Sequence, residues 1–244
     1  MNFEKYSKTF LHFHSDEIPT LINKYLGGNA KSVADLGAGD GSLLIGMKQK
    51  GLLKNVKNIV AVDLSKDRCN RLSQIDGLDV ICADVTEVPQ LESESFDFII
   101  CTQVIEHVDQ EKLLREIKRL IKPDGKLYIA SLIKKKYGFF YYKTLEGKWG
   151  MDPTHLREYA SRSEYENVLI DGGFKIIETT TSALKLSLFE FIVRRIIVPI
   201  FKPKNANSFF LKYKLMNFLR VHINIHPPGY LIVESVVSPS EIIK

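Results

Sequence analysis

Cysteine is scarce in this chain of 244 residues, and only one tryptophan is present. The three cysteines, Cys69, Cys82 and Cys101, form no CxxC pair, which excludes a disulfide framework and a cysteine-based metal site. Cys82 and Cys101 fall in apolar stretches that predict buried strands. We therefore expect the cysteines to be reduced residues of the hydrophobic core.

Long apolar runs are also absent. No uninterrupted run approaches the roughly 20 residues that cross a membrane, and the N-terminus opens with alternating charge and lacks the apolar h-region of a signal peptide. We therefore expect a cytoplasmic protein without a transmembrane segment. The hydrophobic share of 45% is enough for a packed core, and the length fits one α/β domain with an appendage.

A glycine-rich turn is the most informative feature that is present. Residues 33–41 read VADLGAGDG, in which the apolar run Ser32–Leu36 predicts a buried strand and Ser42 begins a helix. Glycines let backbone N–H groups approach a ligand, and the positive end of the helix favours an anion. The spacing G-x-G-x-G differs from the dinucleotide pattern G-x-G-x-x-G, which disfavours NAD.

Three further predicted strands deliver polar residues at their carboxyl ends. Residues 58–63 end in Asp63, residues 79–83 are followed by Asp84, and residues 96–101 lead into Gln103. Open α/β sheets bind ligands at this edge. The sequence therefore predicts a nucleotide-type cofactor site there.

The order of these motifs resembles the class I S-adenosylmethionine-dependent methyltransferases. The matching segments are VADLGAGDG (33–41), AVDLS (61–65), ICADV (81–85), FDFIICTQVIEHV (96–108) and IKPDGKLYI (121–129), and together they cover about residues 30–135. The resemblance implies a Rossmann-like, seven-stranded α/β fold, a three-layer sandwich whose last strand runs antiparallel between the fifth and the sixth. It also implies S-adenosylmethionine as cofactor and S-adenosylhomocysteine as product.

The resemblance assigns a role to each site residue. Around the methionine part and the sulfonium of the cofactor it places Asp35, Gly37, Ala38, Gly39, Gln103 and Val104. Around the nucleoside it places Asp63, which would accept hydrogen bonds from both ribose hydroxyls, Asp84 at the adenine amino group, and Leu64 and Val85 as apolar walls. We expect backbone N–H groups of the turn to meet the carboxylate of the cofactor.

The second half of the chain predicts the rest of the sheet. Ser161 or Ser163 could cap a helix through Leu169, and two strands are expected at 174–181 and 230–237. The expected divisions are an N-terminal helical segment or lid (1–29), the cofactor-binding core (30–181), a helical insertion (182–228) and the last strand with the C-terminus (229–244).

The insertion carries the basic excess of the chain. It holds eight Lys and Arg residues against Glu190, a net charge of +7, whereas the whole chain carries +5. Apolar residues at helical spacing predict two amphipathic helices, at about 188–200 and 211–219. Three interpretations remain open: a substrate lid, a contact with an anionic membrane or lipid-linked substrate, and nucleic-acid binding, which the modest overall charge disfavours.

Two segments after the fifth strand are candidates for the acceptor pocket. The basic and aromatic run 134–143 includes Tyr141; its aromatic residues would either shape the pocket or simply cover the helices. Residues 147–159 resemble a segment with a D-x-T-H-x-R core in methyltransferases associated with glycan and glycolipid assembly. Trp149 and Arg157 in this segment are candidate substrate residues, Arg157 for an anionic group.

Two histidines could remove a proton from an acceptor hydroxyl. His107 follows the fourth predicted strand and His155 lies in the D-x-T-H-x-R segment. Some ubiquinone-pathway and small-RNA methyltransferases bind a divalent metal through a Glu-x-x-Glu-His pattern and a distant His. Glu106, His107 and His155 would fit, but Gln103 replaces the first carboxylate, so we predict no metal.

The sequence thus predicts a methyltransferase that acts on oxygen of a small-molecule, glycan or lipid-linked acceptor. Peripheral membrane contact through 182–228 is part of this prediction. The alternatives are an RNA or nucleoside methyltransferase and a non-catalytic S-adenosylmethionine-binding protein.

Overall fold

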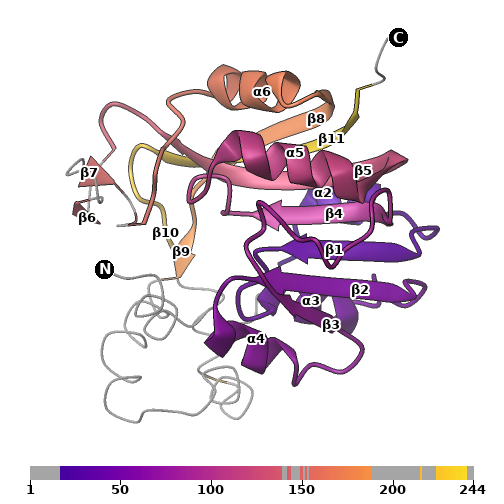
Figure 1. Ribbon diagram of the computed structural model, residues 1–244. Helices are drawn as coiled ribbons and strands as arrows, with labels where there is room; N and C mark the ends of the chain where they lie inside the picture. Colours follow the sequence, from indigo (N-terminus) through magenta and orange to yellow (C-terminus); the bar gives the residue numbers. More distant parts are fainter. Residues whose placement is uncertain are drawn as a thin grey trace.

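The structure is a computed structural model that describes residues 17–138, 142–143, 149–150, 152, 154–187, 215 and 224–240. Its centre is a seven-stranded sheet with strand order β3-β2-β1-β4-β5-β11-β8 (Figure 1). The strands are β1 (Ser32–Leu36), β2 (Asn58–Asp63), β3 (Asp79–Cys82), β4 (Phe96–Thr102), β5 (Ile121–Lys134), β8 (Phe174–Ala183) and β11 (Tyr230–Pro239).

The direction of the strands matches the expected fold. Strands β3, β2, β1, β4 and β5 pair in parallel, whereas β11 pairs antiparallel with both β5 and β8. The carboxyl ends of β1 to β4 therefore lie along one edge of the sheet, and Leu36, Asp63, Cys82 and Thr102 end these strands. The prediction of a Rossmann-like α/β sandwich with an inserted last strand is confirmed.

Helices cover both faces of the sheet, as Figure 1 shows. On one face, α2 (Thr20–Tyr25), α3 (Ser42–Gln49) and α4 (Lys66–Leu72) bury apolar side chains in a common core cluster. On the other face, α5 (Gln110–Leu120) and α6 (Arg162–Asp171) do the same. Strand residues alternate between the two clusters, since Val33 packs on one face and Ala34 on the other.

Two short strand pairs lie outside the main sheet. Strands β6 (Tyr142–Lys143) and β7 (Trp149–Gly150) pair antiparallel, as do β9 (Leu186–Ser187) and β10 (Asn224–Ile225). The β9–β10 pair joins the two ends of the predicted insertion. The two amphipathic helices predicted there lie outside the described residues, apart from the exposed Leu215, and the predicted domain boundaries stay predictions.

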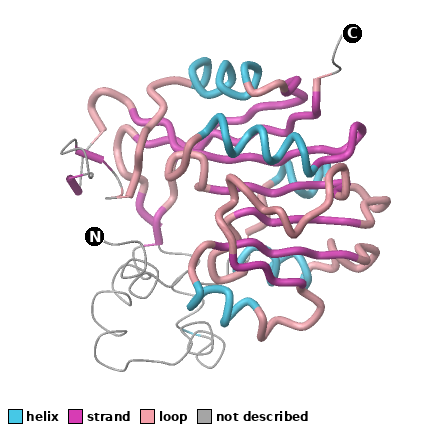
Figure 2. Tube along the Cα trace, in the orientation of Figure 1, coloured by secondary structure: helices cyan, strands magenta, loops and turns pink. Residues whose placement is uncertain are grey.

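Helices in the described part of the chain are too short or too polar to cross a membrane. Figure 2 shows the described helices as short segments that flank the strands, with loops at both ends of the sheet.

One core prediction is wrong. Cys69 and Cys101 are buried, but Cys82 is exposed, and all three are free thiols. The reason is the position of β3, which lies at the edge of the sheet and has a neighbouring strand only on its β2 side. An apolar run in the sequence does not show whether its strand will be central or at an edge.

Candidate functional site

The glycine turn after β1 has a backbone that only glycine adopts easily. Gly37, Gly39 and Gly41 have positive φ angles of 81°, 58° and 74°. A Cβ atom on Gly37 would lie 2.2 Å from Cγ2 of Val104, in the loop after β4. The turn and this loop therefore lie in close contact, as a shared cofactor site requires.

Four N–H groups of the turn donate hydrogen bonds within the protein, and the predicted contact of the turn with the cofactor's carboxylate stays a prediction. Gly37 and Ala38 donate to the carbonyl of Val62, and Gly39 donates to the carboxylate of Asp63. The N–H of Gly41 donates to the carbonyl of Ala38. The glycines thus contribute space and backbone shape, and these four N–H groups hold the turn itself together.

Asp35 is a buried carboxylate beneath the turn. It is 2% exposed, and within the described residues its Oδ1 atom has no hydrogen-bond partner. Burial, together with the nearby charge of Asp63, raises its pKa to about 7. A buried acceptor without a donor is costly, so this atom fits a donor from a bound ligand, such as the amino group of the cofactor.

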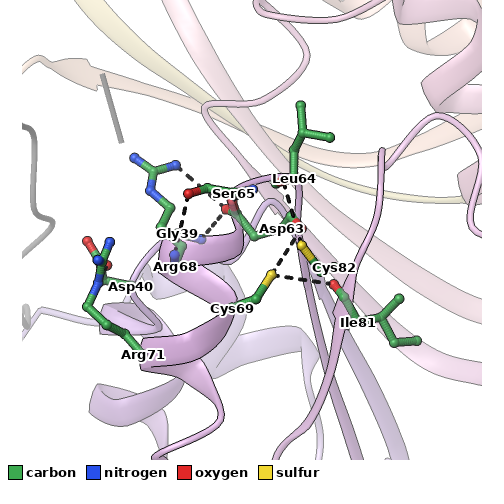
Figure 3. A network of polar contacts seen from close by, with 10 residues as sticks. All are labelled: Gly39, Asp40, Asp63, Leu64, Ser65, Arg68, Cys69, Arg71, Ile81 and Cys82. Atoms are coloured by element: carbon green, nitrogen blue, oxygen red, sulfur yellow. Dashed lines mark hydrogen bonds and ion pairs between the residues drawn. The ribbon is translucent and has the colours of Figure 1, made fainter. Parts of the chain in front are cut away.

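Asp63 ends β2 with a well-fixed carboxylate, which Figure 3 shows at the centre of a polar network. Its Oδ1 atom accepts the N–H of Ser65 and its Oδ2 atom accepts the N–H of Gly39, both at 2.9 Å. A carboxylate has roughly four lone-pair sites, so about one on each oxygen remains for a ligand. That arrangement fits the two neighbouring hydroxyls of a ribose.

The predicted adenine residues lie beside Asp63. Leu64 is a large apolar residue that is 53% exposed, which fits its predicted role as an apolar wall for the adenine ring. Val85 is buried and belongs to the core cluster of the α5 face. The carboxylate of Asp84 is exposed and accepts hydrogen bonds from both the N–H and the hydroxyl of Thr86, each at 2.8 Å.

Gln103 shows backbone strain where β4 ends. Its φ is +55°, an angle that non-glycine residues rarely adopt, and its N–H donates to the carbonyl of Ala130 on β5. Such strain is typical of functional sites. Val104 follows and is buried against the glycine turn.

The two candidate catalytic histidines lie together. The ring centroids of His107 and His155 are 4.7 Å apart. The Thr154 hydroxyl donates to Asp152 at 2.6 Å, so it must accept from Nδ1 of His107, which is 2.9 Å away. His107 therefore carries its proton on Nδ1, and its Nε2 atom is the free acceptor. Burial, and then the charge of His155, lower the pKa of His107 to about 4.

His155 has acidic neighbours. Its Nδ1 atom lies 3.0 Å from Oε1 of Glu158, to which it donates a hydrogen bond that again leaves Nε2 as acceptor. Burial alone would lower the pKa of His155, but Glu158, Glu106 and Asp152 together raise it above its usual value. Glu106 is 1% exposed, and burial raises its pKa to about 7 against the opposing charge of His155.

Arg157 holds this part of the site together. Its Nη1 atom donates to the carbonyls of Ile105 and Val108, both at 2.5 Å, and the N–H of Leu156 donates to the carbonyl of Glu106. These bonds dock the D-x-T-H-x-R segment onto the loop after β4. The substrate role predicted for Arg157 stays a prediction.

Two other predicted substrate residues are not placed. Tyr141 lies outside the described residues, and for Trp149 only the backbone, in β7, is described.

Within the described residues, one cluster has the donors that a metal ion needs. One ligand atom each from Glu106, His107 and His155 lie within 4.8 Å of one another. Oxygen and imidazole donors suit several divalent cations. The same three groups equally suit proton transfer.

The sequence analysis missed the partners of the named residues. They are Arg68 beside Asp63, Thr154 and Asp152 behind His107, and Glu158 behind His155. The D-x-T-H-x-R segment contained the signal for two of them, since its Asp and Thr precede the His. Nothing in the sequence showed that they would face His107.

Comparisons with known proteins agree with this geometry. A family model described as a methyltransferase domain matches residues 34–129. A ubiquinone biosynthesis O-methyltransferase of Neisseria meningitidis is 28% identical over 133 residues, which are 51% of this chain and 56% of that protein. The chain spans between half and two thirds of the length of the first curated relatives it matches.

Solved structures share the fold at low sequence identity. Coclaurine N-methyltransferase, bound to N-methylheliamine and SAH, superposes with a TM-score of 0.59 at 18% identity. The superposition covers 89% of this chain and 68% of the N-methyltransferase chain. The cyclase SpnF superposes with a TM-score of 0.60 at 14% identity and covers 90% of this chain and 78% of that chain. Identities this low show the fold alone.

Proposed function

We propose that this chain, which contains a class I S-adenosylmethionine-dependent methyltransferase domain, transfers a methyl group to oxygen of a small-molecule, glycan or lipid-linked acceptor. One observation supports oxygen as the acceptor atom. His107 and His155 lie side by side where β4 ends, and each ring is held through Nδ1, which leaves Nε2 ready to accept a proton.

The protein has little chemistry to supply besides alignment and proton removal. When bound, S-adenosylmethionine supplies a methyl group on a positively charged sulfur, which is an excellent leaving group. A hydroxyl acceptor must lose its proton as it attacks, so a base in reach accelerates the step. His155 is the stronger base of the pair, because the pKa of His155 is raised and that of His107 is lowered to about 4.

The neighbours of His155 support this role. Glu158 fixes the ring through Nδ1, and the negative charges of Glu158 and Asp152 stabilise the imidazolium that forms when Nε2 accepts the proton. His107 stays neutral near pH 7, because its pKa is lowered to about 4, and its Nε2 atom can accept a hydrogen bond from an acceptor hydroxyl beside His155.

The acceptor class has weaker support. The Neisseria relative is named as an O-methyltransferase of ubiquinone biosynthesis, and residues 147–159 resemble enzymes of glycan and glycolipid assembly. We include Tyr141, Trp149 and Arg157 as acceptor contacts, and the basic insertion 182–228 as a contact with an anionic membrane.

The test is a methyl-transfer assay with labelled S-adenosylmethionine and separate panels of phenols, glycans, lipid-linked glycans, amines and RNA. Transfer to a hydroxyl should fall about 10²- to 10⁴-fold in His155→Asn. The rate of the unmodified protein should rise with pH above 6.5, since His155 must be neutral to act as base. Transfer to RNA or amines alone, or an active His155→Asn protein, contradicts the proposal.

We further expect the reaction to need no divalent metal. Gln103 stands where the metal-binding pattern has a carboxylate, and an amide oxygen is a weaker metal ligand than a carboxylate. Activity should therefore survive EDTA treatment without added metal. Loss of activity with EDTA and its return with Mg²⁺ or Zn²⁺ would show that Glu106, His107 and His155 form a metal centre.

A further inference from the structure

Asp63 shares its buried place with a positively charged side chain. Figure 3 shows the guanidinium of Arg68 joined to the carboxylate of Asp63 by a dashed line. Nη1 of Arg68 lies 3.6 Å from Oδ2 of Asp63, and the two side chains are 7% and 4% exposed. A buried arginine so close to the predicted ribose carboxylate calls for an explanation.

Local structure places Arg68 there. Ser65 is the N-cap of α4, and its hydroxyl accepts the N–H of Arg68 at 3.4 Å. Because side chains of a helix point back toward its N-terminus, Arg68 reaches over the first turn to the end of β2. The acid and the cation are therefore fixed by one continuous segment, from Asp63 to Arg68.

The distance indicates what Arg68 contributes. At 3.6 Å it makes an ion pair with Oδ2 of Asp63, whose hydrogen bonds come from the N–H groups of Gly39 and Ser65. Arg68 therefore adds positive charge beside the carboxylate, at a distance longer than a hydrogen bond.

The remaining charges near Asp63 explain why a cation is needed. Burial raises the pKa of Asp63 above its usual value; the charge of Arg68 and the two N–H groups offset part of this rise, and the charge of Asp40 adds to it. Asp40 itself is paired with Arg71 of α4 at 2.5 Å, and the thiol of Cys69 donates to the backbone carbonyl of Asp63. On β1, Asp35 is a second buried acid, near enough for the charge of Asp63 to raise its pKa.

We propose that Arg68 is a positioning residue for the cofactor: it keeps the buried carboxylate of Asp63 ionised, so that both of its oxygens can accept the ribose hydroxyls. This role rests on the proposed function, in which Asp63 binds the ribose. A protonated Asp63 would lose one acceptor oxygen, so cofactor binding without Arg68 should depend on pH.

The experiment is calorimetric titration with S-adenosylhomocysteine at pH 5.5, 7.0 and 8.5. Arg68→Met should bind at least tenfold more weakly at pH 7.0 than the unmodified protein, and its affinity should rise with pH across the range. Arg68→Lys, which keeps the charge, should bind like the unmodified protein. Arg162→Met, which breaks the exposed pair with Glu166 on α6, is the matched control and should change nothing.

Several results overturn the proposal. Unchanged affinity and pH profile in Arg68→Met would show that Arg68 only packs there, and tighter binding would show that it competes with the ribose. Equal weakening in Arg68→Lys and Arg68→Met would show that charge is not the cause. If Arg68→Met fails to unfold cooperatively on heating, Arg68→Gln takes its place. The proposed function fails separately in either of two cases: the unmodified protein does not bind S-adenosylhomocysteine, or Asp63→Asn binds it as tightly as the unmodified protein does.

Discussion

Asp35 is a residue whose protonation should affect folding, because it is buried and its pKa is raised well above the usual value. Its pKa is about 7 in the folded protein against 3.8 for the free side chain. Between these values the folded protein holds a proton that the unfolded chain lacks, so its stabilising contribution is full below pH 3.8 and is lost as pH rises toward 7. Asp35→Asn should therefore raise the melting temperature at pH 8 and change it little at pH 4.

Asp97 provides the opposite case for the same measurement. Burial raises the pKa of Asp97, but hydrogen bonds from Lys122, Lys31 and Ser32 outweigh this effect and lower the pKa to about 2. Its contribution is present above pH 3.8 and is lost as pH falls toward 2. Asp97→Asn should thus lower the melting temperature at pH 8. If Asp35→Asn also lowers the melting temperature at pH 8, the pKa of Asp35 is not raised.

Residue identities in the site were predictable where a strand end fixes them. Asp63 and Gln103 follow from the rule that ligands meet the carboxyl ends of parallel strands. The contact between His107 and Thr154 did not follow, because it joins residues 47 positions apart through a loop that no local pattern describes. Tertiary packing decides such pairs.

At the scale of elements, α6 offers a clean test of a predicted cap. The sequence left Ser161 and Ser163 as alternatives, and the structure selects Ser161, whose hydroxyl accepts the N–H of Glu164 at 3.1 Å. Because that N–H would otherwise lack a partner, Ser161→Ala should destabilise the protein by about 1 kcal/mol in urea unfolding. Ser163→Ala is the control and should cost less than half as much.

Element boundaries were predictable to within a few residues, with instructive exceptions. Strand β5 runs from Ile121 to Lys134, because Phe96 of β4 pairs with its first residue and Tyr230 of β11 pairs with its last. The exposure of Cys82 likewise depends on where β3 lies in the sheet. Both are properties of neighbouring strands, which the local sequence does not contain.

At the scale of the whole molecule, the insertion should be separable from the cofactor site. Leu186 pairs with Ile225 and Ser187 with Asn224, so residues 188–223 leave and return at one place. Replacing 188–223 by a short Gly-Asn turn should leave S-adenosylhomocysteine affinity within about threefold in calorimetry, because the site residues lie on β1 to β4 and α4. Methyl transfer and binding to anionic lipid vesicles should both decrease.

Two outcomes of replacing residues 188–223 would contradict these expectations. If the shortened protein loses cofactor binding while its melting temperature is unchanged, the insertion contributes directly to the cofactor site. A shortened protein that binds anionic vesicles as well as the full chain does would contradict the proposal that 182–228 contacts an anionic membrane.

The place of β11 has a consequence for how the chain folds during synthesis. This strand, residues 230–239, lies between β5 and β8, so both neighbours have an open edge until it emerges from the ribosome. The parallel half, β3 to β5, can pair as it is made, whereas β8 must wait for a partner that is translated about 50 residues later. Chaperones that bind nascent chains should therefore hold this protein longest between the synthesis of β8 and that of β11.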